Sequence, residues 1–122
     1  MKYLCLVYLD EKRLDELPDE DCVDFDTGIR KSGQCLASEA LQSVQTATTV
    51  RLRNGKVSTT DGPYVETKEQ LGGYFLIEAK DMQEAIGIAA RIPGAWHGCV
   101  EVRPVADDDQ TLTALGLTAA RA

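Results

Sequence analysis

Two short segments, residues 2–9 and 74–79, carry apolar side chains on both of the faces that a β-strand presents. Side chains alternate between the two faces of a strand, so a strand that is apolar on both needs cover on both. These segments therefore predict the two central strands of one sheet. In residues 2–9, one face would hold Tyr3, Cys5, Val7 and Leu9, and the other Leu4, Leu6 and Tyr8.

Two helices are predicted from apolar positions at helical spacing. Pro18, which a first turn tolerates, is expected to open the first helix, and Gly33 is expected to end it. The second follows Asp81, which has Glu84 three positions later in a capping-box pattern, and it ends before Pro93. The apolar stripes are Cys22, Phe25 and Ile29 in the first helix and Met82, Ala85, Ile86 and Ala89 in the second.

Four further segments predict strands. Residues 34–41 form a short strand with a kink around Ser38 and Glu39, and residues 97–105 form the last strand. Residues 48–53 alternate as a half-exposed strand does, and residues 56–60 return antiparallel after Asn54 and Gly55, the strongest short hairpin signal. We expect this hairpin to project from the body and to present the segment that follows it.

The order is then strand, helix, strand, inserted hairpin, strand, helix, strand. This predicts an α+β, ferredoxin-like βαββαβ fold with an inserted β-hairpin, in which right-handed crossovers would make the two central strands parallel neighbours. The helices cover one sheet face, and nothing else in the chain is large and apolar enough for the other. A second copy of the chain is the simplest way to cover that second sheet face, so a homodimer is expected. Residues 1–105 would form the domain, and residues 106–122 a polar tail with a weak helix over 111–120.

The composition restricts the possible partners. A length of 122 residues suits one domain, and a net charge of −7 argues against nucleic acid and anionic membrane as partners. The sequence shows neither a signal-peptide pattern nor an apolar run of membrane-spanning length, so a cytoplasmic location is expected. The four cysteines are scattered and there is one histidine, so we expect no metal, no cofactor and no disulfide framework.

The segment 61–75 combines a turn, a charged cluster and a glycine pair. The residues Asp61-Gly62-Pro63 favour a turn, and Gly72-Gly73 leads into the second central strand. Asp61 could act as a general base or as an Asx-turn residue that bonds its own loop. The candidate ligand-binding side chains are Tyr64, Glu66, Lys68, Glu69, Tyr74 and, from the last strand, Arg103, which could instead pair with Glu101.

His97 is the only histidine and the second candidate catalytic residue. An unperturbed imidazole titrates near neutral pH, but general acid–base work needs a carboxylate to orient the ring. Its possible partners are Asp61, Glu66, Glu69 and Glu101, and the sequence does not choose among them. The alternative is an exposed histidine on a loop.

The run D-G-P-Y-x-E-x-K-E-x-x-G-G-Y, from Asp61 to Tyr74, resembles the motif of the YCII-related family in its DGPF branch. That branch more often has phenylalanine where this chain has Tyr64. The resemblance covers roughly the first hundred residues. It implies a ferredoxin-like fold whose copies pair face to face as a dimeric α/β barrel, and a link to sigma-factor-type regulators, near which such domains are often encoded, but no particular reaction. Some relatives carry a first-helix histidine paired with an aspartate; this chain has no histidine there, so that dyad is not carried over.

Three functions are compatible with these patterns. The first is a homodimeric small-molecule-binding domain with a pocket near the motif. The second is a small-molecule enzyme that uses Asp61 and His97 for acid–base chemistry, and the third is a regulatory module. The sequence contains no nucleophile elbow, phosphate loop or dinucleotide fingerprint. A motif that only locks a dimer is a further alternative.

Overall fold

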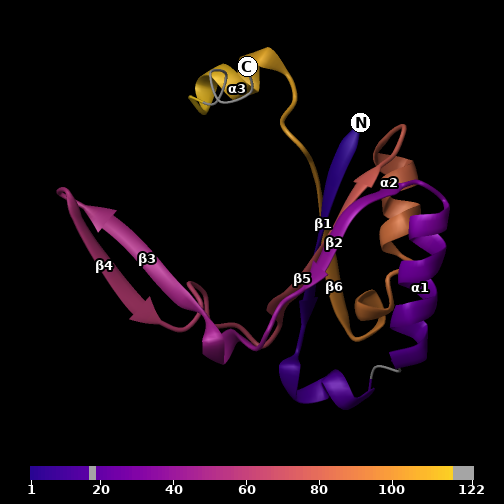
Figure 1. The fold of residues 1–122 in the computed structure, drawn as a ribbon, viewed down its shortest axis with the longest axis horizontal. Coiled ribbons are helices and arrows are strands. Elements are labelled where there is room, and N and C mark those ends of the chain that lie inside the picture. Colours follow the sequence, from indigo (N-terminus) through magenta and orange to yellow (C-terminus); the bar gives the residue numbers. More distant parts are fainter. Residues whose placement is uncertain (17–18, 117–122) are drawn as a thin grey trace.

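The protein is an α+β domain, seen here in a computed structural model that describes residues 1–16 and 19–116. Its main sheet has the strand order β2-β5-β1-β6, and both central strands are the ones expected from the sequence. These strands are β1 (Lys2–Leu9), β2 (Cys35–Ala40), β5 (Gln70–Glu78) and β6 (Gly98–Pro104). Two helices, α1 (Asp19–Lys31) and α2 (Met82–Ala89), lie on one face of this sheet (Figure 1). None of the described helices has the length and apolar character needed to cross a membrane.

The central pair is antiparallel, so the predicted parallel relation is wrong. β1 pairs antiparallel with both β5 and β6, and β2 pairs antiparallel with β5. The physical reason is that the β1–α1–β2 crossover skips one position in the sheet. It makes β1 and β2 run the same way and leaves a gap between them, which β5 fills in the opposite direction.

The core lies between the sheet and its two helices. Tyr3, Cys5 and Val7 of β1 are buried there with Ile77 of β5, and the helices add Ile29, Ala85, Ile88 and Ala89. The predicted stripe of α2 is wrong at one position, because Ile86 is 46% exposed and Ile88 is buried instead. Phe25 of α1 packs against this core. Pro18 and the Cys22 side chain lie outside the described residues.

Two strand predictions also need correction. The irregularity in β2 falls between Cys35 and Ala37, where Leu36 bulges out, and not around Ser38-Glu39. β5 begins at Gln70, so the glycine pair lies inside the strand and does not merely lead into it. A side chain on Gly73 would bring its Cβ to 3.0 Å from the Glu39 carbonyl oxygen, which explains why glycine suits this close approach between strands.

Several element ends follow the expected local chemistry. Gly33 ends α1 with a φ of 78°, a backbone conformation that favours glycine. The Asp81 carboxylate caps α2 by accepting a hydrogen bond from the Glu84 amide at 2.9 Å. Within the described residues, three 3-10 turns connect the elements of the body: η1 (Glu11–Glu16), η2 (Val44–Thr46) and η3 (Pro93–Trp96).

A short helix, α3 (Asp109–Ala114), follows β6 in the tail. It begins two residues before the helix expected over 111–120, and residues 117–120 of that prediction lie outside the described part of the chain. The Asp108 carboxylate accepts a hydrogen bond from the Thr111 amide at 2.7 Å and caps the helix. Hydrogen bonds from Thr111 lower the pKa of this carboxyl below its ordinary value.

The sheet face opposite the helices is apolar at its centre and only partly covered. By strand alternation, Leu4, Leu6 and Tyr8 of β1 point to this open face, and all three are half-buried. Leu76 lies opposite Leu4 in the neighbouring strand. We call this surface the open face. On β6 it carries Glu101 and Arg103, opposite Leu6 and Leu4.

The inserted hairpin stands apart from the main sheet. It comprises β3 (Thr48–Arg53) and β4 (Lys56–Asp61), which form a separate two-stranded sheet. Asn54 and Gly55 have φ values of 51° and 75°, as the type I′ turn expected from Asn-Gly requires. We call β3–β4 the arm. Figure 1 shows it projecting from the body on the side away from α1 and α2. The prediction of a half-exposed strand is wrong, because Val50 and Leu52 are exposed too.

Candidate functional site

A cavity of about 340 Å³ lies between α1, the main sheet and η3. This volume falls at the lower end of the range for small-molecule pockets, which are mostly apolar with a few polar groups. We call it the helix-side cavity. It is lined by Val7, Leu9, Phe25, Asp26, Arg30, Ser38, Glu39, Ala40, Gly72, Gly73, Tyr74, Phe75, Ile92, Pro93 and Gly94.

The apolar wall of this cavity is built from two aromatic rings and from backbone. Phe25 of α1 meets Phe75 of β5 edge to face, with ring centroids 5.2 Å apart and planes at 86°. This is one of the geometries that aromatic pairs prefer. Opposite, Gly94 lies so close to β1 that a Cβ there would be 2.6 Å from Val7 Cγ1. Glycine therefore allows η3 to approach the sheet and close that end of the cavity.

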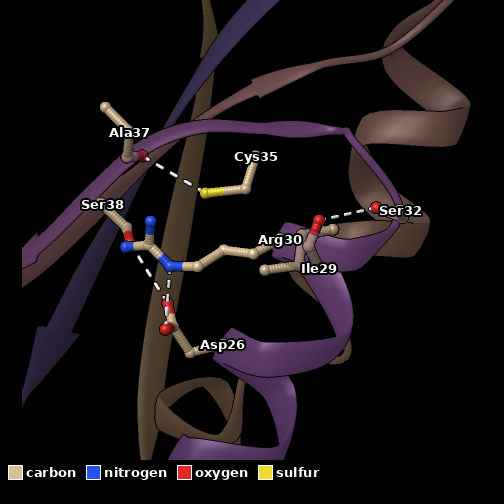
Figure 2. A network of polar contacts seen from close by, with 7 residues as sticks. All are labelled: Asp26, Ile29, Arg30, Ser32, Cys35, Ala37 and Ser38. Atoms are coloured by element: carbon tan, nitrogen blue, oxygen red, sulfur yellow. Dashed lines mark hydrogen bonds and ion pairs between the residues drawn. The ribbon is translucent and has the colours of Figure 1, made fainter.

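The polar wall is a network of three side chains from α1 and β2 (Figure 2). Arg30 donates from Nε to Asp26 Oδ2 at 2.9 Å and from Nη2 to Ser38 Oγ at 2.6 Å. The Ser38 hydroxyl donates in turn to Asp26 Oδ1 at 3.3 Å. The hydrogen bond to Asp26 and the charge of its carboxylate raise the pKa of Arg30 above its ordinary value. A hydrogen-bonded guanidinium, together with the Asp26 and Glu39 carboxylates, thus borders a cavity whose remaining lining is mainly apolar.

Sequence reasoning missed this network. Asp26 and Arg30 are four positions apart on a predicted helix, a spacing that favours an ion pair on the helix surface. That signal was available, but surface pairs of this kind are common and say little about function. Ser38 joins them only because α1 packs beside β2, and the sequence does not show this contact.

The Asp61–Tyr74 motif begins at the base of the arm. Asp61 is exposed at the end of β4, opposite Thr48, and lies outside the helix-side cavity. Gly62 has a φ of 108° and donates its amide to the Ala47 carbonyl at 2.8 Å. No hydrogen bond found between described residues uses the Asp61 carboxylate, so the turn-anchor alternative gains no support. Its catalytic role stays a prediction.

The other motif side chains face several clefts and not one pocket. Tyr64 is exposed and its ring lies under Arg51, with the guanidinium carbon 5.4 Å from the ring centroid. It borders a groove of about 640 Å³ between residues 41–47 and 63–71. Glu66 and Lys68 line a neighbouring cleft beside η1. Tyr74 borders the helix-side cavity, although alternation turns its ring to the opposite face of β5 from that of Phe75.

His97 shares a small cleft of about 180 Å³ with Glu69. The cleft is lined by Asp10, Arg13, Lys68, Glu69, Trp96, His97 and Gly98. The Glu69 carboxylate lies over Gly98, since Oε2 is 3.0 Å from the position that a Cβ would take there. Of the four carboxylates that the sequence offered to His97, Glu69 therefore lines the same cleft, whereas Asp61, Glu66 and Glu101 do not. Asp10, which the sequence did not suggest, lines it too.

Arg103 takes the alternative that the sequence left open. Its Nε lies 3.7 Å from Glu101 Oε2, and both side chains are largely exposed on the open face. Such a pair contributes little stability. Within residues 1–16 and 19–116, no group of three or more histidine, cysteine, aspartate or glutamate side chains is arranged to hold a metal ion.

Comparison with known proteins places this domain in a family. An antiparallel β2-β5-β1-β6 sheet with two helices on one face defines an α+β domain of ferredoxin-like type. Residues 1–108 match the family model of the YCII-related domain. The chain belongs to the YCII-related family, as the motif indicated. It is also 33% identical over 115 residues to an uncharacterized protein of Rhizobium meliloti (strain 1021), covering 87% of this chain and 93% of that protein.

Two solved structures resemble the fold. One is 5-chloro-2-hydroxyhydroquinone dehydrochlorinase (TftG) from Burkholderia phenoliruptrix AC1100, in complex with 2,5-dihydroxybenzoquinone. It has a TM-score of 0.55 at 10% identity and covers 90% of this chain and 98% of that one. The other is a divalent cation tolerance protein from Thermus thermophilus, with a TM-score of 0.40 at 12% identity over 93% of each chain. The first supports the fold alone, and the second is too dissimilar to support any argument.

Proposed function

We propose that this protein is a small-molecule-binding domain whose ligand occupies the helix-side cavity. The observation that carries the proposal is a mainly apolar cavity of about 340 Å³ whose polar wall holds one guanidinium, that of Arg30, beside the Asp26 and Glu39 carboxylates. Apolar walls bury a ligand non-directionally, and one charged group then fixes its orientation. The end of the sequence motif is consistent with this place, because Gly72, Gly73 and Tyr74 border the cavity.

The wall chemistry favours a flat, mainly apolar ligand that carries an anionic group. The Phe25 and Phe75 rings offer an aromatic surface against which a ring can pack. Arg30 uses Nε and Nη2 for Asp26 and Ser38, and no hydrogen bond between described residues uses Nη1. Guanidinium groups bind carboxylates through planar, charge-assisted hydrogen bonds. An aromatic carboxylate or a phenolate fits this combination.

We also propose that the domain acts as a homodimer in the cytoplasm. The support for the dimer is the open face, where Leu4, Leu6 and Leu76 are only half-buried in the single chain. A two-fold pairing through this face would cover the same surface on both copies. Sedimentation at micromolar concentration tests the pairing, and a single species of monomer mass would exclude it.

A second candidate function is acid–base catalysis at the His97 cleft. The observation that favours it is the shared lining by His97 and Glu69, because a carboxylate beside an imidazole can orient it for proton transfer. If the cleft acts on a ligand, His97→Gln should abolish turnover of that ligand while binding in the helix-side cavity persists. Loss of binding together with turnover would contradict a separate catalytic cleft.

The test of the binding proposal uses benzoate and its neutral analogue benzamide as probes, with 2,5-dihydroxybenzoquinone as a third probe because a structural neighbour was solved with it. Binding is followed by protein NMR shifts. We expect Arg30→Gln to weaken benzoate binding by about tenfold or more, because a charge-assisted hydrogen bond is lost, with little effect on benzamide. Arg53→Gln on the arm is the matched control and should change neither. Equal effects of the two variants, or shifts by no probe at residues lining the cavity, would overturn the proposal.

A further inference from the structure

The arm has an apolar face that its own chain leaves uncovered. Val50, Leu52 and Val57 are 63%, 60% and 68% exposed. Register places them together, because Leu52 lies opposite Val57 and Val50 lies opposite Thr59. Alternation puts Arg51, Arg53 and Lys56 on the other face of the same hairpin. The arm is therefore an amphipathic two-stranded ribbon with both faces in solvent.

A hairpin of this kind needs a partner surface. An isolated two-stranded hairpin is at best marginally stable in water, and stability requires a further strand or packing against another element. Among the strands of the described part of the chain, β3 and β4 pair only with each other. Exposed apolar patches rimmed by polar side chains mark sites of protein association. The arm thus has the composition of an interface segment.

The direction of the arm indicates where that partner lies. Figure 1 shows the arm leaving the body on the side opposite α1 and α2, which is the side of the open face. Two unpartnered apolar surfaces, the arm and the open face with Leu4, Leu6 and Leu76, therefore border the same space beside the molecule. One partner molecule bound in that space would cover both surfaces.

The charge distribution favours a second copy of this chain as that partner. The arm carries three basic residues and has one acid, Asp61, at its base, although the whole chain has a net charge of −7. The rest of each molecule is thus strongly acidic and attracts a basic arm from a neighbour. On the open face itself, Glu101 is paired with Arg103 at 3.7 Å, so the attraction comes from the net charge of the body and not from this one acid. The arm's cations lie on the face opposite Val50, Leu52 and Val57, so their attraction acts over a distance as two copies approach.

We propose that the arm of one copy packs its Val50–Leu52–Val57 face over the open face of a second copy, and that the second copy returns the same contact. A two-fold axis satisfies both arms and both open faces at once. This inference rests on the homodimer of the proposed function and specifies which segment holds it together. It makes no use of the helix-side cavity, so binding there and arm exchange can succeed or fail separately.

The test compares oligomeric state by sedimentation for the wild type and three variants. Val50→Thr, Leu52→Thr and Val57→Thr combined removes the apolar face while keeping residues that favour strands. We expect the wild type to be dimeric and this variant to dimerise at least about tenfold more weakly. Ser58→Thr with Thr60→Val, on the opposite face of the arm, is the matched control and should dimerise like the wild type.

A charge variant tests whether weaker dimerisation could come from unfolding of the arm alone. Arg53→Glu with Lys56→Glu changes exposed positions that flank the turn, and it should weaken dimerisation at low salt and recover as salt screens the new repulsion. If both this variant and the threonine variant dimerise as tightly as the wild type, the arm is not at the interface, and only this inference is wrong.

A monomeric wild type that still binds benzoate would overturn the dimer and keep the cavity proposal. Binding of a short single-stranded DNA by the arm would make nucleic acid its occupant and overturn the inference.

Discussion

The Arg30 guanidinium donates from Nη2 to the Ser38 hydroxyl at 2.6 Å, and this bond joins the last turns of α1 to β2. Both residues belong to the polar wall of the helix-side cavity. The bond therefore holds α1 beside β2 within this wall and fixes the direction of the guanidinium.

We predict that Ser38→Ala lowers the free energy of unfolding by about 0.5 kcal/mol, at the low end for a hydrogen bond because the contact is near solvent. Urea denaturation measures the change. Ser58→Ala on the arm is the control and should have no measurable effect on the unfolding of the body. Equal losses in the two variants would mean that the α1–β2 bond contributes nothing to stability.

Gly98→Ala should be strongly destabilising. A Cβ at this position would overlap the Tyr8 carbonyl oxygen, and a backbone atom of β1 cannot move aside without breaking the β1–β6 pairing. We expect a loss of about 1–3 kcal/mol, measured by chemical denaturation. Gly87→Ala in α2 is the matched control: nothing lies within 4 Å of its Cβ position, so helix propensity should make it neutral or stabilising. A milder effect at Gly98 than at Gly87 would contradict the strand register.

Gly55→Val should destabilise the arm by about 1 kcal/mol or more, because a β-branched residue resists the positive φ of 75° found there. The arm is a separate two-stranded sheet, so we expect the loss to be local. Hydrogen exchange of the arm amides is the appropriate measurement, and Gly55→Asn should exchange almost like the wild type because asparagine tolerates this conformation. Unchanged exchange in the valine variant would count against the turn.

Cys5 should make stability depend on pH in the alkaline range. Burial, with a smaller contribution from Cys35, raises the pKa of its thiol from 9.0 to about 11. The unfolded chain ionises first, so the stabilisation is fully present below about pH 9 and is lost as the pH rises to about 11. The loss should reach roughly 2–3 kcal/mol at most.

The measurement is the unfolding free energy of the wild type and of Cys5→Ala across that pH range. Tyrosines and lysines titrate there too, and the difference between the two proteins removes their shared contribution. The wild type should fall more steeply with pH, and parallel curves would refute the assignment. As an independent check, a thiol reagent should modify the exposed Cys99 well before the buried Cys5.

The sequence was sufficient for features that local chemistry decides. Apolar residues on both faces of residues 2–9 identified a central strand, Asn54-Gly55 identified the arm, and Asp81 identified the start of α2. Each of these signals lies within a few residues of the structure that it determines. The motif from Asp61 to Tyr74 identified the family.

The features that failed depend on packing between distant segments. The direction of β5 relative to β1 follows from the whole strand order and not from either strand's side chains. The spacing of Asp26 to Arg30 predicts only a helix-surface ion pair, because the contact with Ser38 on the adjoining strand does not show in the sequence. Glu69 reaches the His97 cleft because β6 pairs with β1 and brings Gly98 beside it. Asp61 is as prominent in the motif as Glu69, yet the fold leaves it exposed at the end of β4.

The position of β1 in the sheet has a consequence during synthesis on the ribosome. β1 leaves the ribosome well before its neighbours β5 and β6, which begin only at Gln70 and Gly98. A nascent chain therefore holds its most apolar strand without a pairing partner until most of the domain has been translated. Sheets that depend on such distant contacts fold slowly, and unpaired strand edges invite aggregation meanwhile. Chaperone binding to the nascent chain should accordingly concentrate on β1 and end once β6 has emerged.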